Sequence, residues 1–115
     1  MTVKQNLEAI KAVIADPANW TQCAFATNKD GDLVAISEGT CFCILGAAAK
    51  VMEVPDEEAY IRGLVNRLAA SKALRKAAWT LHNRSPESVN DNLGHQAVMD
   101  LLEYAIGVEA VKEQA

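Results

Sequence analysis

The sequence predicts a mainly helical α+β fold, in which about four or five helices surround one buried central helix and a single β-hairpin covers an edge. Three observations support this prediction. The central helix, at about 40–52, carries no charge until Lys50. Stretches with an apolar stripe at helical spacing precede and follow it. An Asp-Gly pair within about 22–37 marks a tight turn between two short runs of strand character.

Length, charge and cysteine usage narrow the classes of protein. A chain of 115 residues is expected to form a single domain, 1–115, with a real core. The net charge of -4 comes from mixed signs without a basic run, so no nucleic-acid partner is expected. No apolar stretch reaches the roughly 18 residues that cross a bilayer, and no signal peptide is visible, so no membrane partner is expected. An odd number of cysteines, 3, indicates reduced thiols and a cytoplasmic location.

The first helix has clear start and stop signals. Thr2 and Gln5 fit a capping box, in which each side chain bonds the other residue's backbone N–H. The helix is expected to stop at Asp16, because Pro17 disfavours helical geometry in the residue before it. Its apolar stripe consists of Val3, Leu7, Ile10, Val13 and Ile14. This stripe needs a partner, and the central helix can provide it.

The hairpin and the central helix follow. We expect strands at 23–27 and 33–36, joined by the turn 28–32. Thr40 is the expected N-cap of the central helix, and Pro55 follows its end.

The second half is predicted to be helical. The pattern over 56–80 fits one long helix or two short ones, with acidic residues at its start, an apolar stripe that includes Tyr60 and Ile61, and Ser71 as a cap if the helix breaks. A turn is expected at 85–87. The last helix starts at Gly94 or His95 and ends or bends at Gly107, with Val98, Leu101, Leu102, Ala105 and Ile106 facing inward.

Cys41-Phe42-Cys43 at the start of the central helix is the first place where chemistry could occur. Helix N-termini lower the pKa of a thiol, which activates nucleophilic cysteines. A Cys–His enzyme would use His82 or His95 as the base and Asn90 or Asp91 to orient the ring, which gives Cys41, Cys43, His95 and Asp91 as the candidate catalytic set. The favoured alternative is that both thiols are small core residues. Positions i and i+2 of a helix face roughly opposite ways, so at most one thiol could enter a shared site.

The other candidate sites also have structural alternatives. Cysteine and histidine suit zinc, but the usual ligand spacings are missing, so neither a metal nor a cofactor is predicted. The polar segment 90–95 could bind a small ligand or a partner. We favour a structural role, with Asp91 or Asn92 capping the last helix. Trp20 and Trp79 are expected to anchor the core, each with a partner for its indole N–H.

The same residues resemble a family of small uncharacterised proteins from bacteria and their phages. The resemblance rests on Trp20-Thr21-Gln22, the Asp30-Gly31 turn, Cys41-Phe42-Cys43-x-x-Gly46-Ala47, Asn90-Asp91 with His95, and the closing apolar stripe. The family often has a threonine before this histidine, where the present chain has Gly94. The resemblance covers nearly the whole chain and implies an autonomous domain, but it supplies no activity and no catalytic residue.

Together these observations predict a non-enzymatic binding or interaction module of the cytoplasm. Its expected partner is another protein or a second copy of the chain, because the hairpin edge and alanine-rich helix faces offer packing surfaces. The alternative is a thiol-dependent hydrolase or transferase that uses Cys41 or Cys43 with His95. Whether the chain is an enzyme is left open by the sequence.

Overall fold

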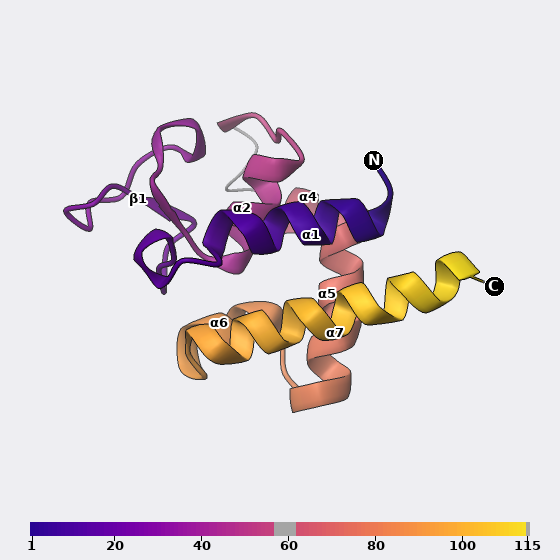
Figure 1. Ribbon diagram of the computed structural model, residues 1–115. Helices are drawn as coiled ribbons and strands as arrows, with labels where there is room; N and C mark the ends of the chain where they lie inside the picture. The colour runs from indigo at the N-terminus through magenta and orange to yellow at the C-terminus, as the bar shows by residue number, and fades with distance from the viewer. Residues whose placement is uncertain (57–61, 115) are drawn as a thin grey trace.

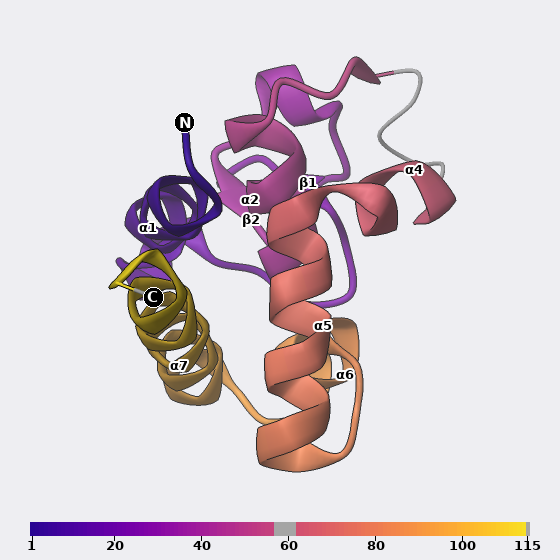
Figure 2. The same ribbon diagram turned by 90° about the vertical axis from the view of Figure 1, so that its right-hand side faces the viewer.

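Two helices, α1 (Val3–Ile14) and α7 (His95–Gln114), lie side by side and run in opposite directions (Figure 1). A third, α5 (Ala69–His82), crosses them at a steep angle (Figure 2). The computed structural model describes residues 1–56 and 62–114. The other elements in these ranges are η1 (Pro17–Asn19), β1 (Ala26–Thr27), η2 (Ile36–Glu38), β2 (Cys41–Phe42), α2 (Ile44–Val51), α4 (Arg62–Arg67) and α6 (Pro86–Asn92). The predicted mainly helical α+β class is confirmed.

The start of α1 follows its sequence signals. Thr2 accepts a hydrogen bond from the Gln5 backbone at 3.1 Å, and the Gln5 side chain accepts one from the Thr2 N–H at 2.9 Å. The predicted capping box is therefore confirmed. The helix itself ends at Ile14, slightly before the predicted stop at Asp16. Its buried residues Leu7, Ile10 and Ile14 face α2 and α7.

The strand pairing differs from the prediction. β1 pairs antiparallel with β2, Ala26 opposite Phe42 and Thr27 opposite Cys41. The segment expected as the return strand, 33–36, makes one bridge from Leu33 to Thr27 and then enters η2. The expected turn does form, because the Asn28 side chain accepts hydrogen bonds from two backbone N–H groups of the loop. The predicted central helix included residues 41–42, which instead form β2, in keeping with the strand preference of Phe42.

The central helix is buried as predicted, but it starts later. Every residue from Ile44 to Ala49 is buried, including the three consecutive alanines. Cys43, and not Thr40, is the N-cap. Gly46 is required here, because a Cβ at this position would lie 1.8 Å from the backbone oxygen of Phe25. The alanines of α2 are packed inside the chain, so this part of the predicted surface for self-association is not exposed.

The described part of the region 56–80 includes α4 and α5 as separate helices. Leu68 has an extended backbone (ψ 140°) that separates α4 from α5. Ser71 is not a cap: it lies within α5, is 2% exposed, and its hydroxyl has no hydrogen-bond partner among the described residues. The predicted stripe residues Tyr60 and Ile61 lie outside the described residues.

The C-terminal third is more helical than predicted. The expected turn at 85–87 is the start of α6, with Ser85 as its N-cap. α7 continues through Gly107, where a stop or bend was expected. The predicted inward residues Val98, Leu101, Leu102 and Ala105 are buried, and Ile106 is partly buried. Trp79 is 53% exposed, so its predicted place in the core is wrong.

No helix in the described part of the chain combines the length and apolar character needed to cross a membrane.

Candidate functional site

Asn90 is a fully buried polar residue that joins three segments distant in the sequence. Its Oδ1 accepts hydrogen bonds from Trp20 Nε1 at 2.7 Å and from the Ile44 N–H at 3.0 Å. Its Nδ2 donates to the Thr21 carbonyl and to Asp91 Oδ1, each at 3.0 Å. All four hydrogen-bonding positions of the amide are therefore filled, which offsets its burial. We call Trp20, Thr21, Ile44, Asn90 and Asp91 the asparagine hub.

The prediction that the indole N–H of Trp20 finds a partner is confirmed. The tryptophan ring also meets His95 edge to face, with ring centroids 5.4 Å apart.

Asp91 holds the neighbouring segment in place. Its Oδ1 accepts a hydrogen bond from the backbone N–H of Cys23 at 2.8 Å. Gln22 strengthens this attachment, because its side-chain amide donates to the carbonyls of Asn90 and Asp91 at 3.2 Å each. Cys23 has a φ of 63°, a left-handed conformation that is unusual for a residue other than glycine.

Asp91 and Asn92 do not cap the last helix, so that expectation is wrong. Both residues belong to α6. Asn92 donates to the Ser88 carbonyl at 3.1 Å within the same helix. The first helical hydrogen bond of α7 runs from the Val98 N–H to the carbonyl of Gly94. The sequence suggested a cap because polar residues before an apolar stripe usually serve as one.

His95 is engaged at the end of α1. Its Nε2 lies 2.7 Å from the carbonyl oxygen of Ile14. A carbonyl oxygen only accepts hydrogen bonds, so this contact places a proton on Nε2. The contact fastens the start of α7 to the end of α1.

The two candidate nucleophiles occupy different surroundings. Cys41 donates its thiol to the Ala18 carbonyl at 3.2 Å. Cys43 is buried, and its sulfur accepts a hydrogen bond from the Gly46 N–H at 3.3 Å. Burial raises the pKa of the Cys43 thiol from 9.0 to about 11, outweighing the backbone hydrogen bonds from Gly46 and Leu45 that lower it. Within the described residues, neither thiol hydrogen-bonds to an imidazole.

The candidate catalytic set is thus divided between separate contacts. Cys43 and Asp91 line one hollow, whereas His95 contacts Ile14 and Trp20. The structure does bring the motifs Trp20-Thr21-Gln22 and Asn90-Asp91 together, and they meet around the amide of Asn90, not around a thiol.

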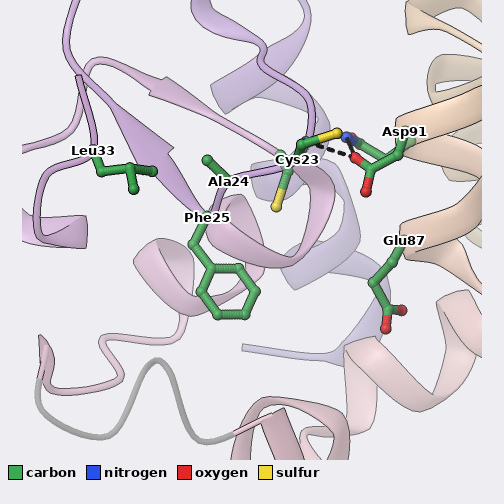
Figure 3. A pocket seen from close by; sticks show the side chains of 8 residues that line it. Cys23, Ala24, Phe25, Leu33, Glu87 and Asp91 are labelled. Carbon is green, nitrogen blue, oxygen red and sulfur yellow. Dashed lines mark hydrogen bonds between the residues drawn. The ribbon is translucent and has the colours of Figure 1, made fainter. Parts of the chain in front are cut away.

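A hollow of about 490 Å³ lies between α6 and the segment 23–25 (Figure 3). We call it the α6 hollow. In Figure 3 the side chains of Glu87 and Asp91 project from α6 on one side, and Leu33 lies on the other with Ala24 and Phe25 between. The lining residues are Cys23, Ala24, Phe25, Leu33, Cys43, Glu87, Asn90 and Asp91.

Glu87 and Phe25 were not singled out from the sequence. One signal was available for Glu87, because Glu87 and Asp91 are four residues apart and such residues share a face of a helix. It was missed because 85–87 was expected to be a turn. Nothing in the sequence places Phe25 near α6.

Among the described residues, no group of three or more histidine, cysteine, aspartate or glutamate side chains is arranged to hold a metal ion.

The fold and the site define a class: a small, mainly helical α+β protein in which one buried asparagine supports an open, partly acidic hollow. The chain belongs to a family of unknown function, DUF6197, whose sequence model matches residues 1–108. Neither the curated proteins nor the solved structures include a match to this chain.

Proposed function

We propose that the protein is a non-enzymatic binding module, and that the α6 hollow receives a positively charged side chain of a partner protein together with an apolar neighbour of that side chain. The observation that carries this proposal is the composition of the hollow. Two carboxylates of α6 face a wall formed by Ala24, Phe25 and Leu33. Leu33 is 75% exposed, so the apolar wall continues to the surface.

The charges of the hollow favour a cationic group. Asp91 uses Oδ1 for the backbone of Cys23, and Glu87 makes no hydrogen bond to the described residues. A lysine or arginine side chain would form charge-assisted hydrogen bonds with these carboxylates. Its aliphatic stem would cover the phenyl ring of Phe25.

The hollow should bind a partner without rearrangement of its backbone. Asn90 and Asp91 hold the backbone around the hollow with hydrogen bonds of 2.7 to 3.0 Å. A site that is already ordered loses less conformational entropy when a ligand binds.

The thiol-dependent alternative has weaker support. With a pKa of about 11, the Cys43 thiol is ionised in only about one molecule in 10⁴ at neutral pH. The candidate base His95 already contacts a backbone carbonyl through Nε2. Fast alkylation of native Cys41 or Cys43 by iodoacetamide near neutral pH would favour the enzyme over the binding module.

The binding proposal is tested with two short peptides, acetyl-Leu-Arg-amide and acetyl-Leu-Gln-amide, titrated into ¹⁵N-labelled protein. We expect the arginine peptide to shift amide resonances of residues 23–25, 33 and 87–91, and the glutamine peptide to bind more weakly. Glu87→Gln should weaken arginine binding by up to about fivefold, the range of a solvent-exposed ion pair.

Glu8→Gln is the matched control, because Glu8 is exposed on α1 and does not line the α6 hollow. Equal binding of the two peptides, or resonance shifts confined to other surfaces, would contradict the proposal.

We also propose a cytoplasmic location. The odd number of cysteines supports it, because structural disulfides of secreted proteins pair their cysteines. Fractionation of the cells that make the protein tests this, and recovery from an extracellular fraction would contradict it.

A further inference from the structure

We propose that Cys23 and Cys43 form a reversible disulfide across the α6 hollow and thereby make the hollow sensitive to oxidation. Both thiols line this hollow, Cys23 at its exposed side and Cys43 in its buried wall. Formation of the bond does not depend on the proposed function. Only its expected effect on peptide binding does.

The strand register places the two residues near each other. The Cys43 N–H donates to the Phe25 carbonyl at 3.4 Å, which extends the pairing of β1 with β2 by one residue. Cys43 therefore lies opposite Phe25, and Cys23 precedes Phe25 by two residues. The Cys23 N–H bonds Asp91, whose neighbour Asn90 accepts a hydrogen bond from the N–H of Ile44, the residue that follows Cys43. A disulfide joins residues whose Cα atoms are about 4.4–6.8 Å apart. A local shift of residue 23 toward Cys43 would bring the pair within this span.

The conformation of Cys23 makes such a shift accessible. Its left-handed backbone, with a φ of 63°, is disfavoured by about 1–2 kcal/mol for a residue with a Cβ. The hydrogen bond to Asp91 holds the residue in this conformation. A movement of Cys23 toward Cys43 exchanges that hydrogen bond for release of the strain.

The third cysteine is held elsewhere. The Cys41 thiol donates to the carbonyl of Ala18 and does not line the α6 hollow. It therefore serves as an internal control for the specificity of the pairing.

The chemistry requires a small disulfide as oxidant, such as glutathione disulfide. The thiolate of Cys23, which solvent reaches, attacks one sulfur of the oxidant and releases one glutathione thiolate. The Cys43 thiol then loses its proton and attacks the Cys23 sulfur, which releases the second glutathione thiolate. Two protein thiols are oxidised to one disulfide, and the oxidant is reduced to two glutathione molecules.

The experiment uses the reduced full-length chain, exposed to a series of glutathione disulfide concentrations and then blocked with N-ethylmaleimide. We expect a monomer lighter by about 2 Da, with two thiols fewer to block, and digestion should give a linked peptide pair containing Cys23 and Cys43. Cys41→Ser should behave in the same way, and Cys23→Ser should form no internal disulfide.

Three outcomes would overturn the inference: mixed glutathione adducts at Cys23 without ring closure, a bond that includes Cys41, or only intermolecular disulfides. Cys23→Ser changes an exposed residue, so this control does not depend on a variant with a disturbed core.

The same samples separate this inference from the proposed function. If the disulfide forms, the arginine peptide should bind the oxidised protein at least about threefold more weakly than the reduced protein. The mass measurement does not depend on peptide binding. A failed peptide titration with a formed disulfide would therefore contradict the binding proposal alone, whereas a missing disulfide with normal binding would contradict only the present inference.

Discussion

At the residue scale, a single amide determines how the site is built. Asn90 combines complete burial with four hydrogen bonds, two accepted and two donated. Aspartate would lack the two donors, and leucine would leave the Ile44 N–H and the Thr21 carbonyl without partners. The position therefore selects asparagine on physical grounds, and no ligand needs to be invoked to explain it.

Replacement of this amide should destabilise the protein strongly. Asn90→Ala removes the partners of Trp20, Thr21 and Ile44 at once, and we expect a loss of about 3 kcal/mol in the free energy of unfolding. Urea denaturation measures it. Asn92→Ala, in the same helix but exposed, should change stability by no more than about 0.5 kcal/mol. Similar losses of stability for the two variants would contradict the prediction that the hydrogen bonds of Asn90 contribute specifically to the stability of the fold.

Because the Cys43 thiol is buried, the free energy of unfolding should change with pH in the alkaline range. The unfolded thiol loses its proton near pH 9.0, whereas the folded one keeps it until about pH 11. Folding therefore takes up a proton between these values, so the stabilisation is complete below pH 9.0 and is lost as the pH rises. The loss should reach about 2–3 kcal/mol. It is measured as the difference in pH slope between wild type and Cys43→Ala, and identical slopes would contradict it.

The residues of the site were only partly predictable from the sequence. Asn90, Asp91, His95 and Cys43 were all singled out, because polar and thiol side chains near helix ends are conspicuous. The long-range contacts of Asn90, Asp91 and His95 were not, because the partners Ile44, Cys23 and Ile14 lie 46 to 81 residues away in the chain. Local patterns carry no information about such pairs, which explains why Asp91 was expected to cap a helix and instead holds Cys23.

At the element scale, α2 owes its place to small side chains. Gly46 lets the backbone of Phe25 approach closely, and the three alanines that follow are buried. The sequence predicted this helix well, since an uncharged run of this length must be covered on all sides. Its first residue could not be predicted, because whether 41–42 is strand or helix depends on β1 as a pairing partner.

Two glycines in helices should respond to the same substitution with opposite signs. Gly46→Ala places a methyl group against the Phe25 backbone, so we expect a loss of about 3 kcal/mol or more. Gly107→Ala meets no atom within 4 Å and should raise stability by about 0.5–1 kcal/mol through helix propensity. Guanidinium denaturation of both variants measures the contrast. If Gly46→Ala left the stability unchanged, the backbone of Phe25 would have to be able to move away from α2, which would contradict the prediction.

At the scale of the whole molecule, α1, α2, α5 and α7 share one core. Leu7, Leu74 and Leu101, which come from three different helices, are each fully buried in the same cluster. Apolar periodicity predicted most of these positions. It failed for Trp79, because a large aromatic residue in a helical pattern is assigned to the core unless the partner helices are known.

Two positions on α7 distinguish the core from the surface. Leu101→Ala should cost about 2–5 kcal/mol, because it opens a cavity in a fully buried position. Val111→Ala, at a position that is 68% exposed, should have an effect within about 0.5 kcal/mol. Thermal unfolding followed by circular dichroism checks both. An equal response would mean that α7 does not close the core along its first three turns.

The long sequence separation between Asn90 and its partners also determines when, during synthesis, this part of the fold can assemble. Three of its four partners, Trp20, Thr21 and Ile44, lie 46 to 70 residues nearer the N-terminus, so the segment 20–23 and the start of α2 leave the ribosome well before the residue that joins them. Until α6 is synthesised, the Ile44 N–H and the indole N–H of Trp20 lack the Asn90 Oδ1 that accepts their hydrogen bonds in the folded protein. The walls of the hollow are thus completed late in synthesis. A nascent chain that stops short of residue 90 contains β1 and β2 but lacks Asn90 and Asp91, two residues that line the α6 hollow.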